Sequence, residues 1–490
     1  MSEENELLRR LFDLLEEYSR ERNSPPLLEY HPPAELQELL ELDRPAGQQD
    51  WDLLFDWIEK YLRYGVKTSS PAFLNRLWSG ANPPSILAEM MVAATNTSAD
   101  SYESAPVSIL YEKHMIREML RLAGFTHGEG QMTTGSSNAN MVAMMCARNL
   151  LPERIKEDGL SGSRKLYAFV NKDAHYSMDK AANILGIGTG NLVKIPFNER
   201  GEMRVGELET AIRKVVREGG IPFFVGLTAG TTVRGAYDPI PEVLSLRDKY
   251  NFWLHVDGAW GGAAIMSDRL REKFMPRLNE VDSFTFDFHK MLGSALICNI
   301  LLLNNSTHTL GTALAAGDTS YLFRDSDDNE VLDLGSVSLQ CARRVDGLKM
   351  FLDWKFYGKE GFGKRVEHYL DLITYAGELV RSTPELELVA PRTSFNLCFR
   401  YKVPEGNAEA FNRRLRNALY HRGQGLVAIA YVEKKLVLRL VISNTQVTRE
   451  TLEELFDRLV SIGRELVETG LQGTEGGMDP SGEGCGPACG

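Results

Sequence analysis

The sequence predicts an α/β protein with a mostly parallel sheet, an N-terminal helical segment and a small α+β domain at its C-terminal end. From about residue 105 to 300, short runs of β-branched and aromatic residues alternate with helical stretches, which is typical of a parallel sheet covered by helices. After residue 386 the apolar runs follow one another closely, as antiparallel strands do. Of the 490 residues, 43% are hydrophobic and 25% are charged, which is ordinary for a globular protein.

Leucine-rich helical patterns mark the N-terminal helical segment, which we expect over residues 1–66. Apolar residues recur at helical spacing in 6–20, 34–42 and 51–64, and proline pairs separate these stretches. A segment of this size cannot bury its own apolar stripes. We therefore expect it to pack on the main body or on a second subunit.

The large α/β domain is expected over residues 67–383, with a long helical region at 338–383. Its predicted strands are the runs KLYAFV, NLVKIPF, IPFFVGLT, FWLHVD, DSFTFDF and ICNILLL. The small α+β domain, 384–469, holds the runs ELELVA, FNLCFRY, GLVAIAYV and LVLRLVIS, and a helix over about 448–468 closes it. Residues 470–490 are rich in glycine, and we expect them to be disordered.

Charge and cysteine content limit the partners. The net charge is −12, from 55 Lys and Arg against 67 Asp and Glu, which argues against general affinity for nucleic acid or anionic lipid. The acidic N-terminus does not resemble a signal peptide, and no stretch reaches the roughly 18 apolar residues of a membrane helix, so we expect a cytoplasmic protein. Cys485 and Cys489 in CGPAC would supply only two ligands. A disordered end is therefore favoured over a redox or metal site, and no metal is predicted.

Polar side chains follow four of the predicted strands at the point where each strand ends. His175 follows YAFV, Thr228 closes FFVGLT, Asp257 follows WLHV, and Lys290 follows SFTF in DFHK. Because ligands bind beyond the carboxyl ends of parallel strands, we expect these side chains to meet at one edge of the sheet. Upstream, GSS opens a helix whose first N–H groups form an anion site. Each signal alone is more often structural, so the hypothesis rests on their shared order.

Pyridoxal phosphate (PLP) is the cofactor whose chemistry needs this set of residues. A lysine forms a Schiff base with its aldehyde, and a carboxylate pairs with its pyridine nitrogen. That carboxylate favours the protonated ring, because a neighbouring opposite charge stabilises the charged form. A helix N-terminus suits the phosphate.

Longer segments carry a family resemblance. They are NTSADSYESAPV, AHYSMDKAANILGIGTGN, TAGTTVRGAYDPI, HVDGAWGG, FHKML, SYLF, LQCARRVD and LVLRLVISN. In these segments the chain, over roughly residues 70–468, resembles the PLP-dependent group II amino-acid decarboxylases. It is most similar to the branch that holds glutamate and cysteine sulfinate decarboxylases. The resemblance implies the PLP fold-type I, aspartate aminotransferase-like architecture for the large domain, and a homodimer with each active site at the subunit interface.

The resemblance also implies roles for individual residues. Lys290 matches the Schiff-base lysine, Asp257 the aspartate on the pyridine nitrogen, and His175 the histidine stacked over the ring. Arg439 matches the arginine that binds a substrate carboxylate, and an arginine of a surface strand is the alternative. Thr228 matches the threonine near the phenolic oxygen of the cofactor, and Ala259 matches the small residue against the second ring face. The residues that match the phosphate contacts are Ser136, Ser137, Asn138 and His289.

Departures from the family pattern bear on the reaction and the substrate. The family usually has NPHK before the lysine, whereas here Asp287 in DFHK places a carboxylate near the phosphate. The loop after SYLF normally carries a tyrosine thought to protonate the carbanion, and residues 324–336, RDSDDNEVLDLGS, contain none. Arg76 and Trp78 lie in NRLWS, where glutamate decarboxylases resemble NQLST. Arg76 favours an anionic substrate side chain. Asp100 lies at a position where an aromatic residue is common, and it would repel an anionic substrate unless Asp100 and Arg76 pair with each other.

The resemblance implies α-decarboxylation of a small acidic L-amino acid, such as glutamate, aspartate or cysteine sulfinate, to the amine and CO₂. Decarboxylation of a non-acidic amino acid is one alternative. Because the loop tyrosine is missing, an oxidative variant that forms an aldehyde is another. An inactive structural homologue is a third. The expected partners are the amino-acid substrate and a second copy of the chain, with no nucleic acid and no membrane.

Overall fold

The computed structural model describes residues 3–47, 49–304, 308–315, 317, 333–403 and 407–469. Within these ranges the chain forms two compact units. One contains residues 3–80, 374–389 and 397–469, and the other contains residues 81–373 and 390–396. The predicted glycine-rich tail lies outside the described residues, as does most of the segment 324–336.

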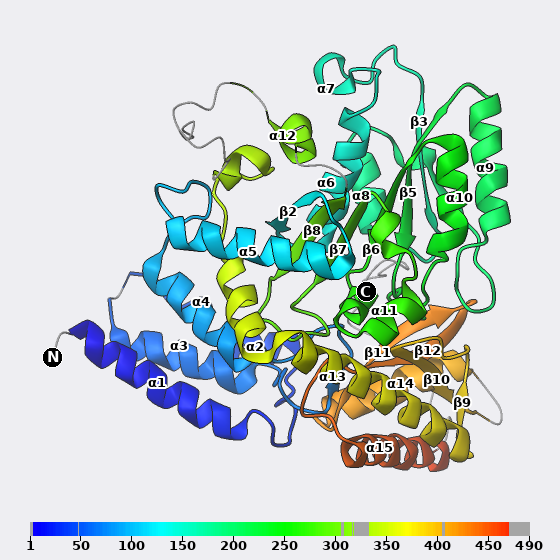
Figure 1. The fold of residues 1–490 in the computed structure, drawn as a ribbon. Helices are drawn as coiled ribbons and strands as arrows, with labels where there is room; N and C mark the ends of the chain where they lie inside the picture. Colours follow the sequence, from blue (N-terminus) through cyan, green and yellow to red (C-terminus); the bar gives the residue numbers. More distant parts are fainter. Residues whose placement is uncertain are drawn as a thin grey trace. The chain divides into compact units, whose positions relative to one another are not determined.

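The larger unit is built on a seven-stranded sheet with the strand order β2-β8-β7-β6-β5-β3-β4 (Figure 1). Among the described strands of this sheet, β8 alone runs in the direction opposite to the rest, which confirms the mostly parallel arrangement. The strand GEGQMT, β2, is missing from the prediction because it holds glycines and polar residues instead of an apolar run. The strands are β2 Gly128–Thr133, β3 Leu166–Asn171, β4 Leu192–Ile195, β5 Ile221–Thr228, β6 Trp253–Asp257, β7 Ser283–Asp287 and β8 Asn299–Asn304.

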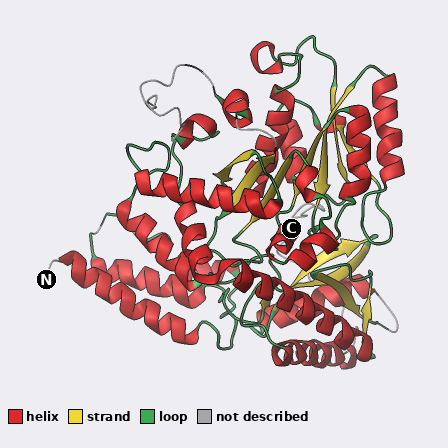
Figure 2. Ribbon diagram, in the orientation of Figure 1, coloured by secondary structure: helices red, strands yellow, loops and turns green. Residues whose placement is uncertain are grey.

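Helices cover this sheet, as Figure 2 shows in red around the yellow strands. The longest, α13, is broken at Gly358, where φ is 62°. The helices are α4 Pro83–Thr95, α5 Pro106–Ala123, α6 Ser136–Asn149, α7 Ile155–Asp158, α8 Ser177–Ile184, α9 Val205–Arg217, α10 Ile240–Tyr250, α11 Asp268–Phe274, α12 Thr309–Leu314 and α13 Asp346–Ser382, whose residues are divided between the two units. Among the described residues, no helix combines the length and the apolar character needed to cross a membrane.

One face of α6 positions the candidate site. Ala139, Val142 and Cys146 recur at helical spacing and pack into the core against strand residues such as Phe224. Ser136 and Asn140, four residues apart, are buried as well. The apolar stripe thus turns two polar side chains of the same helix toward the sheet.

The smaller unit contains a five-stranded sheet with the order β1-β11-β12-β10-β9. Strands β11 and β12 are antiparallel, as are β10 and β9, which confirms the predicted α+β character; β1 adds a parallel edge. In the N-terminal segment α1 and α3 lie side by side, since Arg10 contacts both Asp52 and the ring of Phe55. The elements are α1 Glu3–Glu21, α2 Pro33–Leu39, α3 Trp51–Tyr64, β1 Phe73–Leu74, β9 Leu386–Leu388, β10 Asn396–Tyr401, α14 Ala408–His421, β11 Leu426–Val432, β12 Lys435–Val441 and α15 Arg449–Glu468.

Candidate active site

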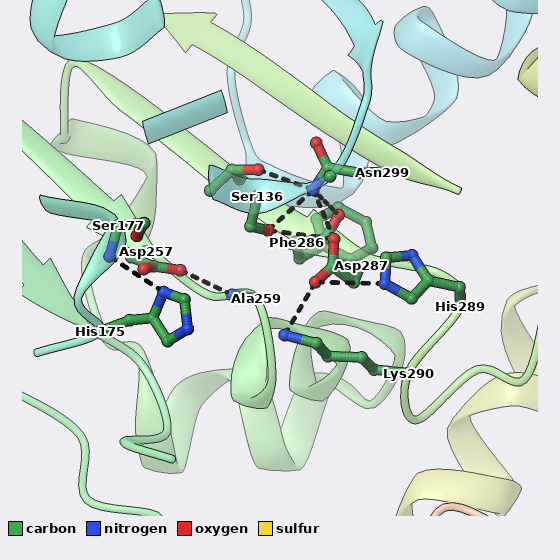
Figure 3. A network of polar contacts seen from close by, with 12 residues as sticks. Ser136, His175, Ser177, Asp257, Ala259, Phe286, Asp287, His289, Lys290 and Asn299 are labelled. Carbon is green, nitrogen blue, oxygen red and sulfur yellow. Dashed lines mark hydrogen bonds and ion pairs between the residues drawn. The ribbon is translucent and has the colours of Figure 1, made fainter. Parts of the chain in front are cut away.

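The carboxyl ends of the parallel strands bring most of the predicted site residues together in the larger unit. The register of β5 and β6 pairs Thr228 with Asp257 at their last positions. His175 lies in the turn between β3 and α8, and Lys290 follows β7 by three residues. Figure 3 shows His175, Asp257 and Lys290 in one close view, together with Ala259 and the start of α6. The geometry is therefore the one expected of a ligand site at the edge of a parallel sheet.

Asp257 is a buried carboxylate, and each of its oxygens accepts a hydrogen bond. Its exposed fraction is 3%. Oδ1 accepts from the backbone N–H of Ala259 at 3.0 Å, and Oδ2 accepts from Nδ2 of Asn140 at 2.8 Å (Figure 3 draws the first). A carboxylate has about four acceptor positions, so these two donors leave capacity for a further donor. A protonated ring nitrogen is such a donor.

The segment GAWGG after Asp257 forms the turn that brings the N–H of Ala259 to the carboxylate of Asp257. A Cβ added at Gly258 would lie 2.5 Å from Cε2 of Phe284, and one added at Gly261 would lie 2.2 Å from the hydroxyl oxygen of Tyr237. Glycine is therefore required for the close packing of this turn. Trp260 between them is buried. The turn is fixed, and the N–H of Ala259 points at the carboxylate.

A buried polar network lies behind Asp257. Asn140 donates through Nδ2 to Asp257 and also to Oγ of Ser177 at 2.9 Å. Its Oδ1 lies 2.9 Å from Nε2 of His255, and Nδ1 of His255 lies 2.8 Å from Oγ of Ser283, its partner on β7. Asn140, His255 and Ser283 have no exposed surface. These groups form a continuous path from β7 to the candidate site.

The sequence prediction missed this network. Two signals were present: Asn140 follows Ser136 by four residues on the buried face of α6, and His255 interrupts the apolar run of β6. A buried polar residue needs a partner, so such interruptions mark candidate networks. Which partner each residue finds depends on strand register, which the sequence alone does not reveal.

The protonation state of His255 follows from its burial. Burial lowers the pKa of His255 to about 4, and the charge of Asp257 opposes this only in part. The imidazole is therefore neutral at neutral pH. A neutral imidazole has one donor nitrogen and one acceptor nitrogen.

Asp287, the last residue of β7, is a second buried carboxylate and contacts the start of α6. Its Oδ1 accepts from Oγ of Ser136 at 3.0 Å and from Nδ2 of Asn299 at 2.7 Å. Its Oδ2 lies 2.9 Å from Nζ of Lys290 and 3.7 Å from Nε2 of His289 (Figure 3). Burial acts to raise the pKa of Asp287, but the charges of His289 and Lys290 and hydrogen bonds from Lys290 and Asn299 lower it below its ordinary value. Asp287 is therefore ionised at neutral pH.

The donor set of this edge fits pyridoxal phosphate. Lys290 offers an amine whose side chain is 19% exposed, and Asp257 has acceptor capacity for a ring nitrogen. Gly135, with φ of +103°, precedes α6, and the first N–H groups of a helix have no acceptor within it. A phosphate can be bound there, with Lys290 balancing the charge of Asp287 beside it.

Three of the predicted substrate residues belong to the smaller unit. Arg439, on β12, is buried, and its guanidinium donates to the backbone oxygen of Asn75. Burial lowers the pKa of Arg439 to about 10, with smaller contributions from neighbours, so the side chain stays charged at neutral pH. Trp78 packs on Phe73, with 5.4 Å between ring centroids, and Arg76 is exposed. A buried guanidinium is well suited to bind a carboxylate.

Two further sequence predictions concern Asp100, which belongs to the larger unit, and the loop that lacks a tyrosine. Asp100 accepts a hydrogen bond from Oγ of Ser104 at 3.3 Å, and its backbone oxygen accepts from the N–H of Gly335 at 2.8 Å. Residues 324–332 of the predicted loop lie outside the described residues. The absence of a tyrosine there remains a property of the sequence.

The low pKa of His255 predicts how stability changes with pH. Between pH 6.5 and about 4 the unfolded chain binds more protons at this position than the folded chain does, so stability is lost as the pH falls. A fall from 6.5 to about 4 corresponds to about 3 kcal/mol. The variant His255→Gln should therefore lose less thermal stability than the wild type between pH 7.5 and 4.5. The exposed His368→Gln is the control and should follow the wild type; equal acid sensitivity of all three proteins would contradict the assignment.

Comparisons with known proteins identify the family of the chain. The family model for the pyridoxal-dependent decarboxylase conserved domain matches residues 33–402. The human acidic amino acid decarboxylase GADL1 is 34% identical over 452 residues, covering 89% of this chain and 86% of the relative. Human cysteine sulfinic acid decarboxylase is 32% identical over 476 residues, covering 94% and 96%. The crystal structure of mouse CSAD in apo form matches with a TM-score of 0.89 at 29% identity, covering 94% of this chain and 99% of that one. The chain belongs to the pyridoxal-dependent decarboxylase family.

Proposed function

We propose that the protein catalyses PLP-dependent α-decarboxylation of a small acidic L-amino acid, such as glutamate, aspartate or cysteine sulfinate, to the amine and CO₂. Membership of the family supports the reaction. The names of the relatives, which act on acidic amino acids and on cysteine sulfinic acid, support the substrate class. The observation that carries the proposal is the grouping of Lys290, Asp257 and His175 at one sheet edge beside the start of α6.

The cofactor would be held by residues of the larger unit. Lys290 would bind the aldehyde and Asp257 the ring nitrogen, for which its two filled acceptor positions leave room. When bound, PLP supplies an electron sink conjugated to the substrate Cα. The other proposed contacts are Ser136, Ser137, Asn138 and His289 with the phosphate, Thr228 with the phenolic oxygen, and His175 and Ala259 with the ring faces.

Two further contacts concern the charge of Lys290 and the position of the proton on His175. Asp287 pairs with Lys290 at 2.9 Å and so supplies the counter-charge of its ammonium group before the cofactor binds. Nδ1 of His175 accepts from the N–H of Ser177 at 3.3 Å. In the neutral imidazole the proton is then on Nε2. His175 is thus oriented by a backbone group, with its donor nitrogen on the opposite side of the ring.

Substrate recognition is proposed for the residues that the sequence indicated. The buried guanidinium of Arg439 would bind a carboxylate of the substrate, because arginine pairs with carboxylates through two parallel hydrogen bonds. Arg76 would meet the second acidic group, with Trp78 as a further pocket residue. Asp100 opposes this assignment, and it is the reason why a non-acidic substrate remains the competing proposal.

A substrate panel tests the proposal. The purified enzyme loaded with PLP is offered glutamate, aspartate, cysteine sulfinate, tyrosine, lysine and diaminobutyrate, while CO₂, amine, aldehyde and oxygen uptake are measured. We expect an acidic substrate to be fastest and to give amine and CO₂ in equal amounts. Faster turnover of tyrosine, lysine or diaminobutyrate would contradict the acidic class. Aldehyde formation with oxygen uptake would establish the oxidative variant instead.

The matched control for this panel is Lys290→Ala. It should abolish turnover, because no other lysine matches the aldehyde-binding position. Borohydride reduction of the wild-type enzyme followed by peptide mapping should place a pyridoxyl group on Lys290. A label on another lysine would refute this part of the proposal, and a wild-type enzyme that binds PLP but turns over no amino acid would favour an inactive homologue.

The proposal includes a homodimer in the cytoplasm. Helix α1 has no buried residue, and the apolar side chains of Leu8, Phe12, Leu54 and Tyr61 on α1 and α3 are exposed, which supports a second copy as their partner. The described cysteines Cys146, Cys298 and Cys341 are free thiols, as suits a reducing compartment. Light scattering at micromolar concentration should give the mass of two chains. A fully active monomer would contradict the dimer.

A further inference from the structure

The hydrogen bonds behind Asp257 have only one possible direction. Nε1 of Trp253 donates to Oγ of Ser283 at 2.7 Å, and from Ser283 the path continues through His255 and Asn140 to Asp257. An indole N–H can only donate, and an ionised carboxylate can only accept. The two ends of the path are therefore a fixed donor and a fixed acceptor.

The carboxylate end and the neutral state of His255 determine every group between them. Asn140 must turn its amide nitrogen toward the carboxylate of Asp257, so its Oδ1 faces His255 and accepts. The proton of the neutral His255 is then on Nε2, and Nδ1 accepts from the hydroxyl of Ser283. The hydroxyl of Ser283 can donate to Nδ1 while its oxygen accepts from Trp253.

We propose that Asn140 and His255 are positioning residues that fix the Asp257 carboxylate in the orientation in which it meets the cofactor ring nitrogen. The inference rests on the proposed role of Asp257. With the N–H of Ala259 on Oδ1 and Asn140 on Oδ2, the carboxylate is held at both oxygens. His255 in turn prevents Asn140 from exchanging its amide oxygen and nitrogen.

The same network also reaches the other side of the site. The second N–H of Asn140 goes to Oγ of Ser177, and the backbone N–H of Ser177 goes to Nδ1 of His175 (Figure 3 draws the latter). One buried amide thereby contacts both Asp257 and the residue whose backbone orients His175. Its removal should disturb the site without removing any group that contacts the cofactor.

Three variants separate positioning from packing. His255→Gln keeps a donor close to the position of Nε2, whereas His255→Leu keeps the volume and removes the donor. Asn140→Asp keeps the size of Asn140 and replaces its donor by a second carboxyl group about 2.8 Å from Asp257. Two carboxylates this close cannot both be ionised, so they would share a proton.

The first measurement uses the apoenzyme with ¹⁵N-labelled histidine. At pH 7 the NMR signals of His255, assigned by comparison with His255→Gln, should be those of a neutral ring with its proton on Nε2. A proton on Nδ1, or a doubly protonated ring, would overturn the inferred direction.

The second measurement titrates each apoenzyme with PLP and records its thermal midpoint. We expect His255→Leu and Asn140→Asp to raise the Kd of PLP at least tenfold, and His255→Gln to stay within threefold of the wild type. A folded His255→Leu that binds PLP like the wild type would overturn the inference, as would a folded His255→Gln as weak as His255→Leu. Both measurements are made without substrate, so their outcome is independent of which amino acid is decarboxylated.

Discussion

The carboxylate of Asp257 is buried at the end of β6, and much of the surrounding structure serves to satisfy it. A buried charge without partners costs several kcal/mol, so its neighbours have to be donors in fixed positions. The glycines of GAWGG allow the turn that aims the N–H of Ala259 at Oδ1, and the buried face of α6 brings Asn140 to Oδ2. The donors that hold this group are all neutral. It therefore retains capacity for a cationic ligand group.

Asp287, the second buried carboxylate of the site, is satisfied in another way. Its partners include Lys290 at 2.9 Å, so its counter-charge comes from the chain itself. Neutral donors, Ser136 and Asn299, fill its other oxygen. In the proposed site, Asp257 would pair with a cationic group of the ligand, whereas Asp287 neutralises Lys290, the amine proposed to react with that ligand. The departure DFHK is accommodated because the lysine lies within contact distance of the carboxylate.

The strands of the parallel sheet could be predicted because a strand buried on both faces is a continuous apolar run, as in LYAFV and FFVGL. Their polar ends could be predicted for the same reason, and the roles of Lys290, Asp257 and His175 came from the family resemblance and remain predictions. The strand β2 was not predicted because it has no such apolar run. The roles of Asn140 and His255 were not predicted because their partners depend on strand register and on the docking of α6. The register pairs His255 of β6 with Ser283 of β7.

The central claim is that Asp257, held by Ala259 and Asn140, carries the negative charge that pairs with the cofactor ring. ¹⁵N NMR of the enzyme loaded with PLP labelled at the ring nitrogen reports that charge directly. The account predicts a protonated ring nitrogen in the wild type and an unprotonated one in Asp257→Asn at the same pH. A neutral pyridine signal in the wild type, or an unchanged protonated signal in Asp257→Asn, would contradict it.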